Sequence, residues 1–192
     1  MIIRPTETFE VIWIGWLVSW VAASFWSGRT AKRATTWETW AYRVAIFAGA
    51  LLIAPWTATA LGERPIWEVG NTGAYALVGV MLAGLLLTWL ARIHLGRVWS
   101  SAITRKDEHR IIDTGPYAFV RHPIYVGIIT ALIATAIIEA TLVALVGAVL
   151  ITLGLWLKAR AEERFLMQEL GPDAYQSYCR RVPMLIPFLP GR

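Results

Sequence analysis

Residues 123–157 read PIYVGIITALIATAIIEATLVALVGAVLITLGLWL, an apolar run of 35 residues in which Glu139 is the single charged side chain. A helix that crosses a bilayer needs roughly 20 apolar residues, so this run is too long for one span and rather short for two full ones. A charge at the bilayer centre is costly, which favours a position for Glu139 at a membrane face. The run therefore predicts a hairpin of two short helices, about 123–138 and 141–157, that turns near Ile138–Thr141.

Three further apolar stretches precede this run, and each has the length of a membrane span: about 8–26, 42–61 and 73–93. A cleavable signal peptide is the alternative for the first stretch, but Glu7 and Glu10 occupy the place where such a peptide carries positive charge. The chain is 57% hydrophobic with a mean hydropathy of +0.53, whereas soluble domains are about 45–50% apolar. The predicted fold is an all-α integral membrane protein of about five transmembrane helices, forming one domain over 1–192.

The basic residues predict the orientation of these spans. With five spans, all but two of the 18 Lys and Arg residues fall on one side of the membrane, the exceptions being Arg4 and Arg64. Lys and Arg concentrate in cytoplasmic loops, so the N-terminus is expected outside and the C-terminus inside. A four-span arrangement would divide the basic residues almost evenly. The net charge of +5 is thus interpreted as topology, with no nucleic-acid partner expected.

Two polar segments on the expected cytoplasmic side carry the candidate chemistry: 115–127, GPYAFVRHPIYVG, and 158–163, KARAEE. Because the hairpin returns the chain to the same face, these segments should be neighbours. They would place Arg121, His122 and the Glu162–Glu163 pair around one cleft. Pro123 suits the first turn of a helix, so the backbone N–H groups near His122 could receive a carboxylate or phosphate.

Each of these features also has a simpler interpretation. Arg121 and His122 could anchor a helix at the membrane interface, and Tyr117 and Tyr125 could belong to the aromatic belt. The glutamate pair could be a solvated helix start. No metal is expected, because ligand spacing such as His-x-x-x-His is absent. A single cysteine, Cys179, excludes an internal disulfide.

The Arg-His-Pro-x-Tyr-x-Gly core of 115–127 resembles the signature of the isoprenylcysteine carboxyl methyltransferase family. The segment LGRVWS at 95–100 is similar to a family motif that precedes it. Downstream, the C-terminal signature of the family is matched by Glu162-Glu163, Leu170-Gly171, Tyr175, Tyr178, Arg181-Val182-Pro183 and Pro187. The resemblance covers about 95–187, half of the chain.

This resemblance implies a membrane methyltransferase that uses S-adenosylmethionine and a lipophilic acceptor that enters from the bilayer. The cofactor pocket would be cytoplasmic, built from the loop, the last two spans and the tail helix. Its implied cofactor-binding residues are Gly115, Tyr117, Arg121, His122, Pro123, Tyr125, Gly127, Glu162 and Glu163. The implied catalytic residues are Lys158, Arg160, Glu162 and Glu163.

One position departs from the family pattern. Family members often carry an Arg one helical turn before the first glutamate, where this chain has Lys158, with Arg160 between. Lys cannot give a carboxylate the planar two-point grip of Arg, which weakens the case for a prenylcysteine carboxylate as acceptor. The resemblance then favours the small prokaryotic-type members, located in an inner membrane, whose acceptors are not prenylated proteins.

Two other functions remain open at this stage. Membrane sterol reductases share a related C-terminal fold and a similar His-Pro-x-Tyr-x-Gly turn but bind NADPH. The negative charges of the glutamate pair would repel the phosphates of that nucleotide. A non-enzymatic membrane scaffold or chaperone partner would have no pocket for an adenosine cofactor. The acceptor can be a carboxylate, a thiol or an amine, and the last two need a base, for which Glu163 and His122 are the candidates.

Overall fold

The structure, a computed structural model, describes residues 5–25, 30–33, 37–96, 99, 104–106, 111–170 and 172–189. Several positions used above lie outside these ranges. They are Trp26 at the end of the first expected span, Arg97, Val98 and Ser100 of the loop motif, Gly171, and the basic residues Arg4, Arg29, Arg110 and Arg192.

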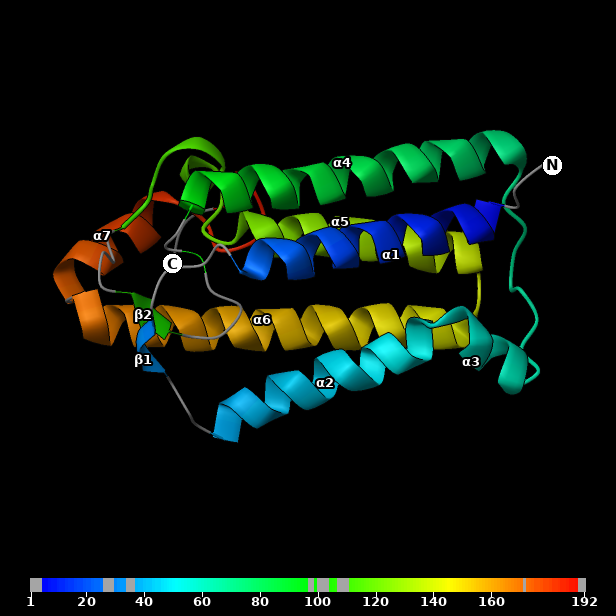
Figure 1. Cartoon of the computed structure of the whole chain (residues 1–192), viewed down its shortest axis with the longest axis horizontal. Helices are drawn as coiled ribbons and strands as arrows, with labels where there is room; N and C mark the ends of the chain where they lie inside the picture. The colour runs from blue at the N-terminus through cyan, green and yellow to red at the C-terminus, as the bar shows by residue number, and fades with distance from the viewer. Residues whose placement is uncertain are drawn as a thin grey trace.

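Five helices lie side by side and alternate in direction (Figure 1). They are α1 (Pro5–Ser24), α2 (Trp37–Ile53), α4 (Asn71–Leu95), α5 (Pro123–Glu139) and α6 (Leu142–Leu170). Among the described residues, 71–95 and 142–169 form the two helices long and apolar enough to cross a membrane, while 39–53 and 123–139 form shorter apolar helices. The helical fold is as predicted, and the number of five spans stays a prediction.

The hairpin between α5 and α6 turns where the apolar run was expected to turn. Ala140 adopts a left-handed conformation with φ 52° and donates its N–H to the carbonyl of Ala136 at 3.1 Å. The second helix is longer than expected, because α6 continues to Leu170 without a break at Lys158. Ala161 and Phe165 of this extension pack on Tyr42 of α2, so Glu162 and Glu163 lie within a packed helix and not at a solvated helix start.

Glycines allow two helix pairs to approach backbone to backbone. A Cβ at Gly49 of α2 would meet the carbonyl oxygen of Gly147 of α6 at 2.6 Å. A Cβ at Gly84 of α4 would meet that of Gly127 of α5 at the same distance, 2.6 Å. Small residues at such contacts are typical of helices that pack in membranes. These two contacts fix the rotation of α5 and α6, and with it the direction of their polar side chains.

The helix α1 joins this core through aromatic side chains. The indole N–H of Trp13 donates to the Thr135 hydroxyl at 3.0 Å, and that of Trp16 donates to the Thr88 hydroxyl at 2.9 Å. Trp16 and Trp20 stack with ring centroids 4.9 Å apart. Interhelical hydrogen bonds of this kind replace water for polar groups inside a membrane.

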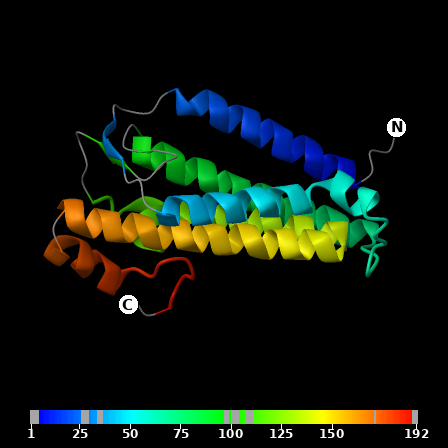
Figure 2. The ribbon, with the colours of Figure 1, turned by 90° about the horizontal axis from the view of Figure 1, so that it is seen from below.

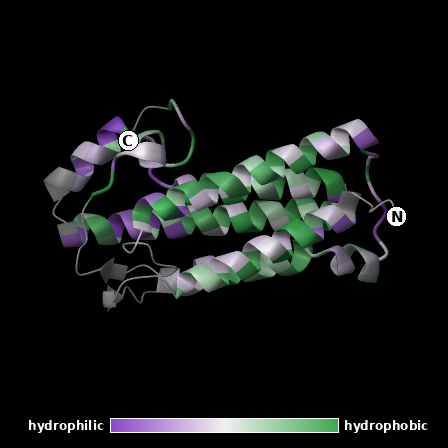
Figure 3. Cartoon of the chain, turned by 45° about the horizontal axis from the view of Figure 1, so that its top comes forward, coloured by the Kyte–Doolittle hydropathy of each residue, from purple (hydrophilic) through white to green (hydrophobic). Residues whose placement is uncertain are grey.

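The sides of the bundle are apolar and both of its ends carry hydrophilic residues, most extensively around the last turns of α6, at what we call the polar end (Figure 3). Figure 2 shows the C-terminal part of the chain beside this end. The outward faces of α1, α2 and α4 expose large apolar side chains, among them Val11, Val18, Val44, Phe47, Leu86 and Leu90. The polar end holds the 3₁₀ helix η2 (Gly115–Ala118), α7 (Pro172–Arg181) and a short ribbon in which β1 (Thr30–Arg33) pairs antiparallel with β2 (Thr104–Lys106). This ribbon departs from the all-α prediction. The other end holds the short helix α3 (Pro55–Ala60) (Figure 1).

Candidate active site

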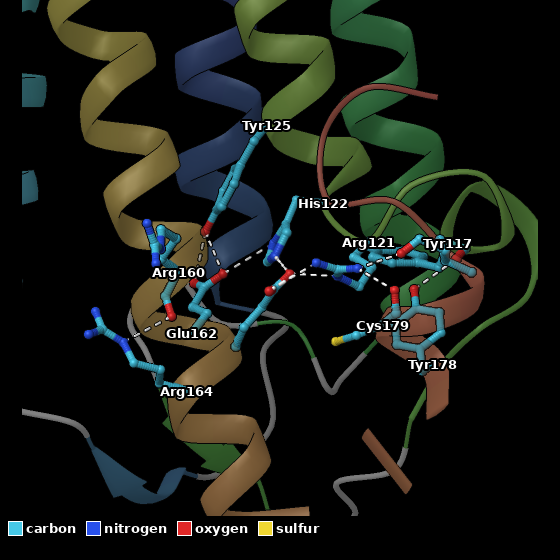
Figure 4. A network of polar contacts seen from close by, with 11 residues as sticks. Tyr117, Arg121, His122, Tyr125, Arg160, Glu162, Arg164, Tyr178 and Cys179 are labelled. Carbon is cyan, nitrogen blue, oxygen red and sulfur yellow. Dashed lines mark hydrogen bonds and ion pairs between the residues drawn. The ribbon is translucent and has the colours of Figure 1, made fainter. Parts of the chain in front are cut away.

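The two polar segments singled out in the sequence meet where α5 begins, beside α6 (Figure 4). His122 is the N-cap residue of α5 and Pro123 occupies its first turn, buried. The backbone N–H of Arg121 donates to the Pro183 carbonyl at 2.9 Å, and that of His122 donates to the Met184 carbonyl at 3.2 Å. The N–H groups of Arg121 and His122 are therefore not available to an external anion, because the segment after α7 already binds them.

Arg121 and Glu163 form a buried two-point ion pair. Arg121 Nε lies 2.6 Å from Glu163 Oε1 and Nη2 lies 3.0 Å from Oε2, with the two side chains 4% and 10% exposed. Arg121 Nη1 also donates to the carbonyls of Cys179, at 2.9 Å, and Val182. Burial lowers the pKa of Arg121, but the hydrogen bond and charge of Glu163 more than offset this and raise it above its usual value. We call Arg121, Glu163, Cys179 and Val182 the clasp, since they tie α6 to the end of α7.

His122 lies between the two glutamates. Its Nε2 is 3.1 Å from Glu163 Oε1, and its Nδ1 is 3.6 Å from Glu162 Oε2. The imidazole stacks on the ring of Tyr125 with centroids 5.2 Å apart and planes inclined by 4°. These contacts fix the position and orientation of the imidazole beside Glu163.

Glu162 is held more loosely, on the other side of His122. The Tyr125 hydroxyl lies 2.8 Å from each carboxylate oxygen of Glu162 and donates its proton to them. Lys158 Nζ lies 3.9 Å from Oε1, one helical turn before Glu162. The Glu162 side chain is 19% exposed, about twice the fraction of Glu163. We call Tyr125, Lys158 and Glu162 the open face. The Glu162 carboxylate can still accept further hydrogen bonds, whereas both oxygens of Glu163 are bound by Arg121 in the clasp.

Tyr117 lines the same end of the bundle from η2. Its carbonyl accepts a hydrogen bond from the Tyr178 hydroxyl at 2.7 Å, and its ring stacks on His94 with centroids 6.3 Å apart. Burial raises the pKa of Tyr117, Tyr175 and Tyr178, so these phenols stay neutral at neutral pH. Neutral phenols add hydrogen-bond donors without adding charge.

The remaining predicted residues lie apart from this network. Gly115 has φ +58° and supports the edge of the His94 ring, where a Cβ would come within 2.7 Å. Gly127 faces Gly84 and Thr88 in the contact of α5 with α4. Arg160 is exposed, and its guanidinium lies 4.8 Å from the Trp156 ring. The predicted residues that the structure brings together at this site are Tyr117, Arg121, His122, Tyr125, Lys158, Glu162 and Glu163. The side chain of Arg160 and the two glycines, Gly115 and Gly127, take no part in the hydrogen bonds among them.

Sequence reasoning missed one charged residue near the site. Arg92 of α4 is fully buried, with its guanidinium carbon 3.4 Å from the Trp99 ring. A charge in the last turns of an apolar span is the signal that could have identified it. Within the described part of the chain, no group of three or more His, Cys, Asp and Glu side chains is placed to hold a metal ion.

Comparison with known proteins identifies relatives of this chain. The model of the Isoprenylcysteine carboxyl methyltransferase (ICMT) family matches residues 77–168, which include the clasp residues Arg121 and Glu163 and the whole open face. A Protein-S-isoprenylcysteine O-methyltransferase of Schizosaccharomyces pombe is 31% identical over 131 residues, covering 65% of this chain and 52% of that protein.

Two bacterial relatives carry a different name. A Methanethiol S-methyltransferase of Pseudomonas sp. (strain GM41(2012)) is 31% identical over 150 residues, covering 72% of this chain and 55% of that protein. Methanethiol S-methyltransferase 1 of Bradyrhizobium diazoefficiens is 33% identical over 133 residues, covering 64% of this chain and 46% of that protein. The chain thus spans about half the length of these curated relatives.

Proposed function

Because residues 77–168 belong to the isoprenylcysteine carboxyl methyltransferase family, we propose that this chain transfers a methyl group from S-adenosylmethionine to a lipophilic acceptor. The observation that carries the proposal is the hydrogen-bonded network between the Arg-His-Pro-x-Tyr segment and the glutamate pair. Tyr125 binds Glu162, while Arg121 and His122 bind Glu163. All five residues lie inside the family match.

The donor set fits a cofactor that carries positive charge. Bound S-adenosylmethionine supplies a methyl group on a sulfonium cation, beside an ammonium group and a ribose diol. The Glu162 carboxylate, oriented by the Tyr125 hydroxyl, can accept hydrogen bonds from an ammonium or a hydroxyl group. The Glu163 carboxylate is engaged by Arg121 and His122, so its role is to hold the site together.

Methyl transfer is an in-line displacement that depends mainly on positioning, which can supply about 7–11 kcal/mol. A carboxylate or thiolate acceptor needs no strong base. A thiol or amine must lose a proton, and His122 is the better placed of the two candidate bases, because Arg121 neutralises Glu163.

The names of the relatives support a proposal for the class of acceptor. The name of one relative describes methylation of an oxygen of protein S-isoprenylcysteine, and the names of two others describe methylation of the sulfur of methanethiol. We infer that a lipophilic carboxylate or thiol is the acceptor here. The apolar sides of the bundle support an approach from the membrane.

The topology proposed with this function has five spans, the N-terminus outside, and the site at the cytoplasmic face. The alternating directions of the five long helices support it, since the start of α1 and the end of α6 lie at opposite ends of the bundle (Figure 1). Reporter fusions near Glu63 and after Arg181 should report opposite sides of the membrane. Equal signals at both positions would contradict the proposed topology but would not bear on the proposed methyl transfer.

Calorimetry with detergent-solubilised protein tests the cofactor. S-Adenosylhomocysteine, the product form, should bind, and NADPH should not. Binding of NADPH alone would replace the methyltransferase with a reductase. Binding of neither nucleotide would favour a scaffold without an adenosine pocket.

A further inference from the structure

Arg92 of α4 is a buried cation whose hydrogen bonds are incomplete. Its side chain is fully buried, and its Nη2 donates to the carbonyl of Ala23 in α1 at 2.5 Å. Its Nε and Nη1 have no hydrogen-bond partner among the residues that the structure describes. A guanidinium has five N–H donors, and leaving buried donors unpaired is unfavourable. Such an arrangement is unusual in a folded protein unless a ligand or ordered water completes it.

Two tryptophan rings, whose planes are inclined by 89°, lie close to this guanidinium but offer its N–H groups no hydrogen-bond acceptor. Its central carbon lies 3.4 Å from the centroid of the Trp99 ring and 5.8 Å from that of Trp20. A ring that lies over the face of a guanidinium attracts the positive charge. An indole ring carries an N–H donor and no acceptor, so neither tryptophan completes the hydrogen bonds of Nε and Nη1. Arg92 is therefore held by aromatic side chains while these two nitrogens have no hydrogen-bond partner among the described residues.

Arg92 belongs to the same end of the bundle as the open face. Trp99, which touches the guanidinium, shares one buried cluster with Tyr117 and Tyr125. The charges of Glu162 and Arg92 both act on the Tyr117 hydroxyl, the first raising its pKa and the second lowering it. Tyr117 thus lies within electrostatic reach of both an acidic group and a basic group. An end of the bundle that holds both charges suits a ligand pair that carries the two opposite charges.

We propose that Arg92 receives a carboxylate in the active site, either the amino-acid carboxylate of the cofactor or the carboxylate of the acceptor. The proposal rests on the methyltransferase function argued above. Cationic groups would bind at Glu162 and the anionic group at Arg92.

Two pairs of ligands distinguish the sources of the carboxylate. S-Adenosylhomocysteine carries the amino-acid carboxylate, and 5′-methylthioadenosine lacks it. A long-chain alkylthioacetic acid mimics an acidic acceptor, and its primary amide is the neutral twin. Calorimetry with the full chain and with Arg92→Gln should show a loss of about ten- to a hundredfold in affinity for one carboxylate ligand, with its neutral twin unchanged. The ligand pair that shows this loss identifies whether the carboxylate belongs to the cofactor or to the acceptor.

Matched controls separate recognition from packing. Arg43 is an exposed arginine whose guanidinium lies 5.7 Å from the Trp40 ring, so Arg43→Gln removes a similar cation and aromatic contact and should leave all four affinities unchanged. Equal losses for acid and neutral twin in Arg92→Gln would assign Arg92 to packing and overturn the proposal. Unchanged binding in both arms would overturn it as well.

The proposal stays testable if Arg92→Gln does not fold. Arg92→Lys keeps the charge between the tryptophans and removes the planar donors, so it should lose part of the same selectivity. The parent chain gives a third test, since it should prefer S-adenosylhomocysteine over its carboxamide, or the acid over its amide. No preference in either pair contradicts the inference. If the parent binds neither adenosine ligand, the proposed function fails instead, and the acid and amide pair still tests Arg92.

Discussion

Glu162 and Glu163 are neighbours in α6, yet the clasp and the open face give them different surroundings. Glu163 is paired with Arg121 through both carboxylate oxygens, and the same guanidinium reaches two carbonyls at the end of α7. Glu162 is bound by one phenol and lies near one amine. Successive residues on a helix point about 100° apart, so adjacent identical residues can serve structure and ligand binding separately.

The first prediction is the largest expected effect and tests the clasp. Glu163→Gln removes the charge and leaves the Arg121 guanidinium buried without its counter-ion. Breaking a buried ion pair on one side typically destabilises a protein by about 3–5 kcal/mol. Thermal unfolding in detergent should therefore show a large loss of stability for this variant.

A second acidic residue provides the control for that experiment. Asp113 pairs with Arg181 at 3.2 Å, but the two side chains are 39% and 63% exposed. Exposed pairs are worth about 0–1 kcal/mol, so Asp113→Asn should unfold close to the parent. If Glu163→Gln is as stable as Asp113→Asn, the clasp does not hold the fold and the comparison fails.

The second prediction tests the open face. Glu162→Gln keeps the shape of the side chain and removes the carboxylate that would receive a cationic ligand. A hydrogen bond to a charged group is worth about 1.5–3 kcal/mol, so affinity for S-adenosylhomocysteine should fall roughly ten- to a hundredfold. The melting temperature of the ligand-free protein should change little.

Glu68, an exposed residue before α4, is the matched control for charge alone. Glu68→Gln should change neither affinity nor stability. A Glu162→Gln variant that binds like the parent, or that unfolds like Glu163→Gln, would show that the two glutamates share one role.

The third prediction extends the comparison to a glycine that the sequence assigned to the cofactor pocket. A Cβ at Gly127 would meet the Gly84 carbonyl and Thr88 of α4. Overpacking of this kind typically costs about 1–3 kcal/mol, so Gly127→Ala should lower stability. Gly79→Ala is the control, because nothing lies within 4 Å of a Cβ there. If Gly127→Ala loses affinity for S-adenosylhomocysteine but unfolds like the parent, Gly127 belongs to the cofactor pocket instead.

Much of this arrangement could be predicted from local sequence. The length of the apolar run and the position of Glu139 predicted a hairpin near 138–141, where Ala140 makes the turn. The hairpin in turn predicted that the Arg-His-Pro segment would meet the glutamate pair. Both inferences need only the number of residues per span and the direction of the chain.

The pairing of individual side chains could not be predicted in this way. Whether Arg121 meets Glu162 or Glu163 depends on the rotation of α5 and α6, which the contacts at Gly127 and Gly147 fix from other helices. The surroundings of Arg92 include Trp20, which is distant in sequence. The β1–β2 ribbon likewise joins segments that are far apart along the chain. Such non-local packing leaves no periodic signal in a single sequence.

The fourth and smallest expected effect concerns the orientation of Glu162. Tyr125→Phe keeps the ring that stacks on His122 and removes the hydroxyl that donates to both oxygens of Glu162. The carboxylate remains and can bind water, so the loss in affinity for S-adenosylhomocysteine should correspond to about 0.5–1.5 kcal/mol. Tyr75→Phe, at an exposed position in α4, should have no effect.

The double variant decides whether Tyr125 acts through Glu162. If the phenol only orients the carboxylate, Tyr125→Phe should cost little further affinity once Glu162→Gln is in place, because the two residues form one interacting unit. Independent effects that simply add would mean that Tyr125 contacts the ligand itself. In that case the open face would present two separate ligand-binding groups, and Glu162 would have to be held by Lys158 and the helix alone.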